Sequence, residues 1–251
     1  MTNVIICGIG GKMGRMLKER ADSLDNINIV AGVDKFCNAD YNFPIFKDFD
    51  SCNILCDAVI DFSRPEALKQ ILAYSVKNKI PAVLCSTGYE NEHKKMIEQA
   101  SKGVAIFQSS NMSLGVNLIS ELIKRAAEFL EGFDIEIIEK HHNKKVDSPS
   151  GTALSLANSI NSVFDGRKKY VYGRHSLNEQ RQTDEIGIHS IRGGTVVGEH
   201  DVVFLGNDEV VTISHCALSK NVFVEGAFKA AEFISGKTAG IYSMNDMLNI
   251  K

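Results

Sequence analysis

The chain has 251 residues, of which 44% are hydrophobic, enough to bury a core in one large domain or two smaller ones. Its formal net charge of -3 offers no general attraction to nucleic acid or to an anionic membrane surface. No apolar run approaches the roughly 18 residues that a membrane-spanning helix needs, and the first residues show neither the basic region nor the cleavage site of a signal peptide. Six scattered cysteines form no Cys-x-x-Cys pair, so we expect reduced thiols in a cytoplasmic protein, with no disulfide framework and no zinc site.

Strands and helices are predicted to alternate through the first half of the chain. Apolar runs predict strands at residues 4–9, 27–33, 54–62, 81–86 and 104–109. Apolar residues at helical spacing predict a helix after the first strand and another over residues 91–102. Between them, Ser63 is expected to cap a helix that has Pro65 in its first turn and Glu66 three residues on. This alternation is typical of a parallel sheet covered by helices on both faces.

The pattern changes near residue 112, which predicts a second domain. Its expected elements are helices over residues 114–130 and 151–161 and strands over residues 134–142, 185–192, 195–205 and 209–215, followed by a final amphipathic helix over residues 221–234. Glycine turns separate the last three strands, so this region is predicted to be antiparallel. Residues 166–184 show little periodicity and are expected to form a long loop. The fold class that follows is α/β, with a parallel-sheet domain joined to a mixed α+β domain.

A glycine-rich turn lies between the first predicted strand and the first predicted helix. It consists of Gly8, Ile9, Gly10, Gly11, Lys12, Met13 and Gly14, so the last glycine falls one position later than in the usual G-x-G-x-x-G pattern. Glycines here let the backbone turn tightly and approach a pyrophosphate, whose charge the start of a helix favours. Asp34 ends the second strand, where a carboxylate accepts hydrogen bonds from an adenosine ribose. This context predicts a dinucleotide site.

The preferred dinucleotide is left open by two adjacent residues. Asp34 favours a free ribose 2′-hydroxyl, whereas Lys35 can hold a 2′-phosphate, so NADH, NADPH or both are expected. Polar residues after two later strands are placed to contact the same cofactor, because ligands bind at the carboxyl ends of parallel strands. They are Cys85, Ser86 and Thr87 after one strand, and Ser109, Ser110, Asn111 and Met112 after the next.

Residues 139–153 form the most distinctive segment of the chain. Its chemically active residues are His141, His142, Lys144, Lys145 and Asp147, followed by a helix start at Gly151 and Thr152. Imidazole, ammonium and the N–H groups of a helix start together suit a small dicarboxylate. A positioned acid there can deliver a proton while a nicotinamide supplies hydride. Because adjacent strand residues point to opposite faces, both histidines enter one pocket only where the strand twists or ends.

The same segment follows the pattern E-x-H-H-x-x-K-x-D-x-P-S-G-T-A. It resembles the signature of the 4-hydroxy-tetrahydrodipicolinate (dihydrodipicolinate) reductase family of bacterial diaminopimelate and lysine biosynthesis. Further segments similar to that family are the glycine turn, residues 86–88, residues 111–117, Arg192-Gly193-Gly194 and Val197-Gly198-Glu199-His200. The resemblance covers essentially the whole chain. Cys85 and Ser86 differ from the glycine and threonine that are common in the family.

The resemblance implies a role for each candidate residue. His141 is the expected catalytic imidazole and Lys145 the expected proton donor, and the expected ligands of the substrate carboxylates are His142, Gly151 and Thr152. The expected dinucleotide contacts are Gly8, Ile9, Gly10, Gly11, Lys12, Met13, Asp34, Lys35, Cys85, Ser86, Thr87, Ser109, Ser110, Asn111 and Met112. The implied reaction is the reduction of 4-hydroxy-tetrahydrodipicolinate to tetrahydrodipicolinate, with loss of water, by NADH or NADPH. The resemblance also implies a Rossmann-like domain of residues 1–112 with 219–251, a substrate-binding domain of residues 113–218, and a homotetramer.

The residues alone leave two other functions open. A different two-domain dehydrogenase, acting on amino or keto acids, would use the same glycine turn without the histidine–lysine cluster. A dinucleotide-sensing protein would bind NADH tightly and reduce no cyclic substrate. The presence of both His141 and Lys145 argues against such a sensor.

Overall fold

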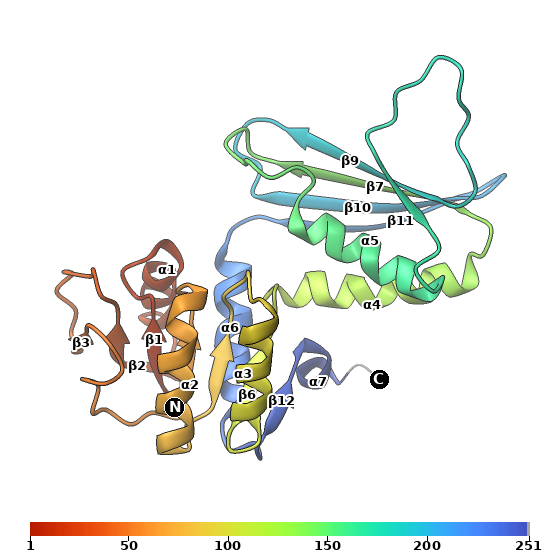
Figure 1. Ribbon diagram of the computed structural model, residues 1–251. Coiled ribbons are helices and arrows are strands. Elements are labelled where there is room, and N and C mark those ends of the chain that lie inside the picture. The colour runs from red at the N-terminus through yellow and green to blue at the C-terminus, as the bar shows by residue number, and fades with distance from the viewer. Residues whose placement is uncertain (250–251) are drawn as a thin grey trace. The chain divides into compact units, whose positions relative to one another are not determined.

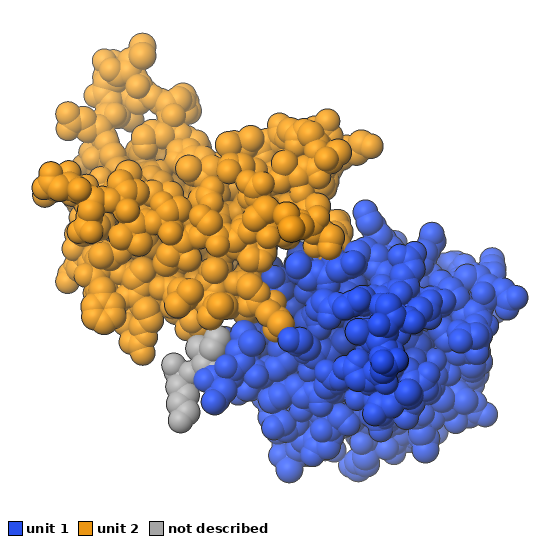
Figure 2. Space-filling view, turned by 180° about the vertical axis from the view of Figure 1, so that it is seen from behind, with its two compact units in different colours: residues 1–113, 221–251 blue, residues 114–220 orange. Residues whose placement is uncertain are grey.

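The computed structural model of the protein describes residues 1–249, which divide into two compact units (Figure 2). Unit 1 comprises Met1–Ser113 and the segment that starts at Asn221, and unit 2 comprises Leu114–Lys220. The divisions fall next to the expected boundaries at residues 112 and 218. No helix of residues 1–249 has the length and apolar character needed to cross a membrane.

Unit 1 is built around a parallel seven-stranded sheet, with the strands in the order β12-β6-β5-β4-β1-β2-β3 (Figure 1). The strands are β1 (Thr2–Cys7), β2 (Ile27–Val33), β3 (Ile45–Phe46), β4 (Ala58–Asp61), β5 (Ala82–Leu84), β6 (Ala105–Gln108) and β12 (Gly240–Tyr242). Every residue of β4 and β5 is buried, as expected for strands covered on both faces. The prediction of a parallel sheet is confirmed.

Helices cover both faces of this sheet (Figure 1). They are α1 (Lys12–Ala21), α2 (Leu68–Asn78), α3 (Asn91–Ser101) and α6 (Asn221–Ile234), with the short α7 (Met244–Leu248) following β12. Helix α1 packs beside α6, and α2 packs beside α3. The last of the large helices therefore returns to the first domain, so that the two ends of the chain build one unit.

Two sequence predictions in unit 1 are wrong. The strand expected over residues 54–62 is only β4. At the start of the expected strand, the carbonyl of Ile54 accepts a hydrogen bond from the hydroxyl of Tyr74 in α2 and not from a neighbouring strand. Ser63 caps no helix, since both its N–H and its hydroxyl donate to Oδ1 of Asp61, at 2.9 and 2.5 Å. A short 3₁₀ helix, Pro65–Ala67, starts after Arg64 instead and leads into α2.

Unit 2 has a mixed five-stranded sheet, with the strands in the order β11-β10-β7-β9-β8. The strands are β7 (Asp134–His141), β8 (Lys169–Tyr172), β9 (Glu185–Arg192), β10 (Gly198–Leu205) and β11 (Val210–Ala217). Two helices, α4 (Leu114–Phe129) and α5 (Gly151–Val163), pack against each other and share one apolar core with the sheet. The expected mixed domain is therefore confirmed in its general architecture.

Two details of unit 2 differ from the sequence predictions. The strands after residue 185 alternate in direction as predicted, but β9 does not pair with β10, because β7 lies between them and runs parallel to β9. The segment 166–184 is not entirely a loop, since it contains β8, which pairs in parallel with β9 at the edge of the sheet. Both differences come from pairing between segments distant in sequence, which local periodicity does not encode.

Strand β7 positions the polar residues that matter for function. Its side chains alternate strictly between half-buried and buried positions, and Ile135 and Ile137 lie in the core. The same inward face continues with Glu139 and His141, which are 0% and 8% exposed. The strand thus extends a core-facing row into a buried carboxylate and a buried imidazole.

Candidate active site

The glycine turn of unit 1 is shaped by close backbone contacts. Gly8 has a φ of +81°, and a Cβ there would lie 2.8 Å from the carbonyl oxygen of Phe62. At Gly14 a Cβ would lie 2.3 Å from the carbonyl oxygen of Gly8 and 2.5 Å from Cα of Ile9. Gly14 therefore provides the close approach of helix to strand, even though it falls one position later than in the usual pattern.

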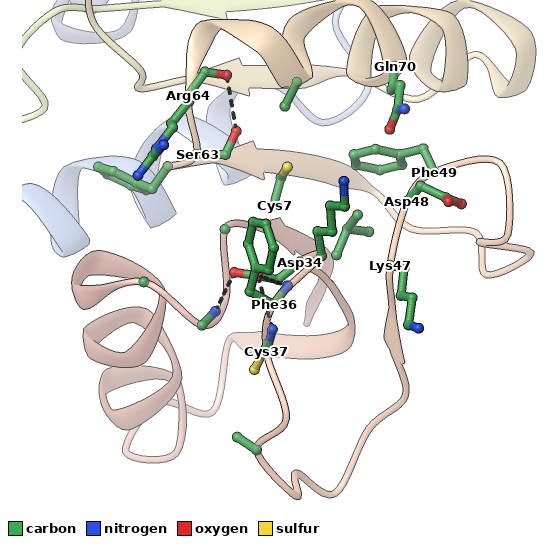
Figure 3. Close-up of a pocket in the computed structure, with 18 of the residues that line it drawn as sticks. Cys7, Asp34, Phe36, Cys37, Lys47, Asp48, Phe49, Ser63, Arg64 and Gln70 are labelled. Carbon is green, nitrogen blue, oxygen red and sulfur yellow. Dashed lines mark hydrogen bonds between the residues drawn. The ribbon is translucent and has the colours of Figure 1, made fainter.

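A cavity of about 1080 Å³ opens beside this turn, entirely within unit 1 (Figure 3). Glycines 8, 10 and 11 line it together with Asp34, and its cations come from Arg15, Lys35, Lys47 and Arg64. Its walls also include the exposed ring of Phe36. A cavity that combines a glycine turn, four basic side chains and a carboxylate at the end of β2 suits a dinucleotide.

Asp34 is held rigidly in this cavity (Figure 3). Its Oδ2 accepts a hydrogen bond from the N–H of Gly10 at 2.9 Å, and its Oδ1 accepts from the N–H groups of Phe36 and Cys37 at 2.9 and 3.1 Å. A carboxylate has about four acceptor sites, so after these three hydrogen bonds Asp34 retains capacity for about one more, from a ribose hydroxyl. The N–H groups of Lys12 and Met13 belong to the first turn of α1, where no intrahelical acceptor exists.

The other side chains predicted to contact the dinucleotide differ in their exposure to solvent. Cys85 and Met112 are buried, and the side chain of Ile9 packs against Gly32, so these three can meet a ligand only through their backbones. Thr87 and Ser110 are exposed. The Ser109 hydroxyl donates to the carbonyl of its near neighbour Asn111 at 2.7 Å. Burial strongly raises the pKa of the Cys85 thiol, which makes it a poor nucleophile.

Asp61 is a buried residue of unit 1 that the sequence analysis did not identify. It is 0% exposed at the end of β4, and its Oδ2 accepts hydrogen bonds from Ser86 at 2.8 Å and Tyr89 at 3.2 Å. Its Oδ1 accepts from Ser63. Asp61 thereby fixes two of the loops at the carboxyl edge of the sheet, and Ser86 has a structural partner in addition to any ligand.

In unit 2, Glu139 and His141 lie next to each other on the inward face of β7. Oε2 of Glu139 is 2.6 Å from Nδ1 of His141 and accepts a hydrogen bond from Arg192 at 2.6 Å. Burial opposes ionisation of Glu139, but hydrogen bonds from Arg192 and its other neighbours outweigh that effect and lower its pKa to about 2. Burial lowers the pKa of His141, although the Glu139 carboxylate opposes this shift.

His142 directly follows His141, the last residue of β7. It is half-buried, and its Nδ1 has no hydrogen-bond partner among residues 1–249. Lys145 follows in a turn in which its N–H donates to the carbonyl of His142 at 3.1 Å. The ammonium of Lys145 donates to both oxygens of Asp147, at 2.7 and 2.9 Å, and the hydrogen bond from Lys145 lowers the pKa of Asp147.

Helix α5 begins at Gly151, as predicted, and Ser150 caps it. The Ser150 hydroxyl accepts a hydrogen bond from the N–H of Ala153 at 3.1 Å and lies 2.9 Å from Nε2 of His200. Gly151 is exposed, and a Cβ there would meet no atom within 4 Å, so the helix start has open space beside it. An open, capped helix start can bind a carboxylate.

Three residues of this cluster were not predicted as site residues. Arg192 and His200 come from β9 and β10, far along the chain, and Glu139 was noted only as part of the signature. The His200 ring is 4% exposed and stands edge-on to that of His141, with centroids 5.2 Å apart. Burial, reinforced by the nearby His141, lowers the pKa of His200 to about 4. The clustering of these groups depends on strand order, so the sequence offers no local signal for it.

The described part of the chain contains no group of three or more His, Cys, Asp or Glu residues that could hold a metal ion. Unit 2 brings together imidazole, ammonium, guanidinium and helix N–H groups. These groups bind anions and transfer protons.

Comparisons with known proteins agree with this chemistry. The family models for the N-terminus and the C-terminus of dihydrodipicolinate reductase match residues 2–112 and 115–248. A 4-hydroxy-tetrahydrodipicolinate reductase of Clostridium tetani is 48% identical over 250 residues, covering 99% of this chain and 98% of that protein. A reductase of the same name from Caldanaerobacter subterraneus is 50% identical over 248 residues, which again covers 99% of this chain and 98% of that protein. A solved dipicolinate-bound dihydrodipicolinate reductase from Paenisporosarcina sp. TG-14 shares the fold, with a TM-score of 0.80, 24% identity and full coverage of both chains. The chain belongs to the dihydrodipicolinate reductase family.

Proposed function

We propose that the protein reduces 4-hydroxy-tetrahydrodipicolinate to tetrahydrodipicolinate, with loss of water, in the biosynthesis of diaminopimelate and lysine. Its reductant is NADH or NADPH. The observation that supports this most strongly is the family membership over nearly the whole chain, together with the complete histidine–lysine signature at residues 139–153. An amino-acid dehydrogenase would not require that signature.

The dinucleotide is proposed to bind in the cavity of unit 1. The turn of Gly8, Gly10 and Gly11 would face the pyrophosphate, with Lys12 and Met13 offering the first N–H groups of α1. Asp34 would accept the ribose hydroxyls, and Lys35 would stabilise a 2′-phosphate when one is present. The bound nicotinamide supplies the hydride. Further contacts are proposed for the backbones of Ile9, Cys85 and Met112 and for Ser86, Thr87, Ser109, Ser110 and Asn111.

The substrate dicarboxylate is proposed to bind in unit 2. Lys145, His142 and the N–H groups at Gly151 and Thr152 would hold its two carboxylates, because cations and helix starts favour negative charge. His141 and Lys145 are the proposed catalytic residues. Reduction of a conjugated ring gives an enamine that must be protonated, and an ammonium or imidazolium group at that carbon donates the proton. Each positioned proton transfer typically contributes about a hundred- to ten-thousandfold in rate.

The direct test is the loss of reduced-nicotinamide absorbance when the cyclic substrate is generated in situ, run separately with NADH and NADPH. The proposal predicts turnover with at least one of them, and no oxidation of amino acids with NAD. Tight binding of NADH without any reduction of the cyclic substrate would instead identify a dinucleotide-sensing protein.

We also propose a homotetramer in the cytoplasm. Apolar side chains remain exposed on strands of the second sheet and just after it: Ile191, Val210 and Leu218 are 50%, 60% and 89% exposed. Such surface favours association with further copies. All six cysteines are free, which agrees with a reducing compartment. Light scattering on the purified protein gives the oligomeric state, and a monomeric mass at micromolar concentration would contradict the tetramer.

A further inference from the structure

Glu139 occupies an unusual position for a carboxylate, because it is completely buried at the inward-facing end of β7. Its Oε2 lies 2.6 Å from Nδ1 of His141 and 2.6 Å from Nη1 of Arg192. Its Oε1 accepts hydrogen bonds from Nη2 of Arg192 at 2.6 Å and from the N–H of Ser150 at 3.0 Å. A carboxylate that faces an arginine fork and a backbone N–H is ionised and held in one orientation.

The ionised carboxylate determines which nitrogen of His141 carries the proton. A carboxylate in this state only accepts hydrogen bonds, so Nδ1 of His141 is the donor. In the neutral imidazole, Nε2 then has the lone pair and is the atom that exchanges a proton with a ligand. Gly198 stands beside it, where a Cβ would lie 3.0 Å from Nε2. A side chain at position 198 would therefore crowd the reactive nitrogen.

The same carboxylate also fixes the start of helix α5. Ser150, whose N–H donates to Glu139, is the capping residue of that helix. Arg192 also connects Glu139 to the loop before this helix, because its Nη2 donates to the carbonyl oxygen of Asp147 at 2.7 Å. Asp147 in turn binds the ammonium of Lys145. One buried ion pair thus connects the imidazole, the ammonium loop and the helix start.

We propose that Glu139 is a positioning residue that holds His141 in the tautomer with a free Nε2 and holds the start of α5 in place, and that Arg192 fixes Glu139 in that role. The proposal rests on the proposed function in taking His141 as the reacting imidazole. It adds a reason why an ion pair with a fully buried carboxylate lies beside the histidine–lysine loop: the pair sets the geometry of both of the groups that meet the dicarboxylate.

Glu139→Gln tests this proposal. The amide has nearly the shape of the carboxylate, but an NH₂ group, which donates hydrogen bonds, replaces one of the two accepting oxygens. If the amide NH₂ replaced Oε1, it would face the N–H of Ser150 and a guanidinium nitrogen, and neither can become an acceptor. If it replaces Oε2, it faces one fixed donor instead of two, Nη1 of Arg192, and its other neighbour is His141, whose ring can change from donor to acceptor. The amide is therefore expected to turn its NH₂ toward His141 and move the imidazole proton from Nδ1 to Nε2.

The readout is the ¹⁵N NMR spectrum of the histidine side chains, assigned with His141→Asn. Wild type is expected to show His141 protonated at Nδ1, and Glu139→Gln to show it protonated at Nε2, with turnover reduced at least about tenfold. Binding of NADH should not change, since the cavity for it is built from residues of unit 1 alone. The matched control is Glu199→Gln, which removes a carboxylate that binds Lys140 at 3.0 Å on the neighbouring strand. It should leave the His141 tautomer as in wild type.

A wild-type His141 protonated at Nε2 would overturn the proposal without any variant, so the test survives even if Glu139→Gln does not fold. Turnover of Glu139→Gln within about twofold of wild type would overturn it as well. A wild type that has the expected tautomer but reduces no cyclic substrate would support the positioning role and remove the proposed function instead.

Discussion

Lys145 binds both carboxylate oxygens of Asp147, at 2.7 and 2.9 Å, two residues further along the same turn. The Lys145 side chain is 20% exposed and that of Asp147 is 59% exposed, so the pair lies at the surface of unit 2 with the ammonium partly shielded. A pair this exposed contributes little to stability. Its effect is to hold the ammonium group in one orientation, which suits the role proposed for Lys145 in ligand binding.

Lys145→Ala should therefore abolish most of the turnover and leave the fold intact. We expect kcat to fall by about a hundredfold or more, because a positioned proton donor is lost, while the dissociation constant of NADH is unchanged. Steady-state kinetics and a fluorescence titration of NADH measure the two quantities. Lys144→Ala is the matched control, since Lys144 is exposed in the same turn and binds no carboxylate of the described residues. Near-normal turnover of Lys145→Ala would remove this lysine from the mechanism.

Asp34→Asn should change the preference of the protein for NADH over NADPH, measured as the ratio of the two KM values. The substitution removes the negative charge beside the ribose and weakens a charged hydrogen bond, which is typically worth about 1.5–3 kcal/mol. We expect the KM for NADH to rise about tenfold or more and that for NADPH to rise less, because repulsion of the 2′-phosphate also disappears.

Lys35→Ala should shift this preference in the other direction, because the KM for NADPH should rise more than the KM for NADH. Parallel KM measurements for both dinucleotides provide the test. Equal changes for NADH and NADPH in both variants would show that neither residue faces the 2′ position. Asp50→Asn, which alters an exposed carboxylate outside the cavity, should change neither KM.

Gly14→Ala should destabilise unit 1 because the added Cβ would lie too close to three backbone atoms of Gly8 and Ile9. It would lie 2.3 Å from the carbonyl oxygen of Gly8 and 2.5 Å from Cα of Ile9, neither of which can move without shifting the turn. We expect a loss of about 1–3 kcal/mol in the free energy of unfolding, the usual range for overpacking, together with weaker NADH binding. Urea denaturation measures the first effect. Gly103→Ala is the control in the same unit, because its Cβ would have only ordinary contacts at 3.7 Å and beyond.

The buried His200 should make the stability of unit 2 depend on pH. Its pKa is lowered by burial to about 4, whereas an unfolded histidine titrates near pH 6.5. Between those values the unfolded chain binds a proton that the folded chain does not. Lowering the pH from about 6.5 to about 4 therefore decreases the free energy of unfolding, by at most about 1.4 kcal/mol per pH unit for this one group.

His200→Asn should remove that contribution. We expect the stability advantage of wild type over the variant to be largest at pH 7 and to shrink as the pH falls toward 4, as measured by urea denaturation across this range. His175→Asn changes an exposed histidine and should leave the pH dependence as in wild type. A constant difference between wild type and His200→Asn at every pH would contradict the buried, neutral state of this ring.

Strong local patterns predicted much of the fold. The strands β2 and β9 and the helix α6 coincide with the residues expected for them, because each has a regular apolar period along its whole length. The short strands β3, β8 and β12 were missed. They have two to four residues and exist through pairing with other strands, so no periodicity marks them. For the same reason the position of β7 between β9 and β10 was not foreseen.

The candidate site shows the same division between local and distant information. The turn that places Lys145 beside Asp147 and starts α5 at Gly151 lies within one continuous segment, and the sequence was sufficient to predict it. Arg192 reaches Glu139 from 53 residues further along the chain. Only the parallel pairing of β9 with β7 brings them together. Asp61 was missed because a carboxylate at a strand end shows no sign, in sequence, of whether it is buried.

The measurement that tests the central claim most directly is a crystal structure of the protein with NAD and pyridine-2,6-dicarboxylate, a stable planar diacid. We predict one carboxylate of the diacid within hydrogen-bonding distance of the Lys145 ammonium and the other at the N–H groups of Gly151 and Thr152, with Nε2 of His141 facing the ring. A diacid that binds with no contact to residues 139–153 would contradict the assignment of this segment as the place of catalysis.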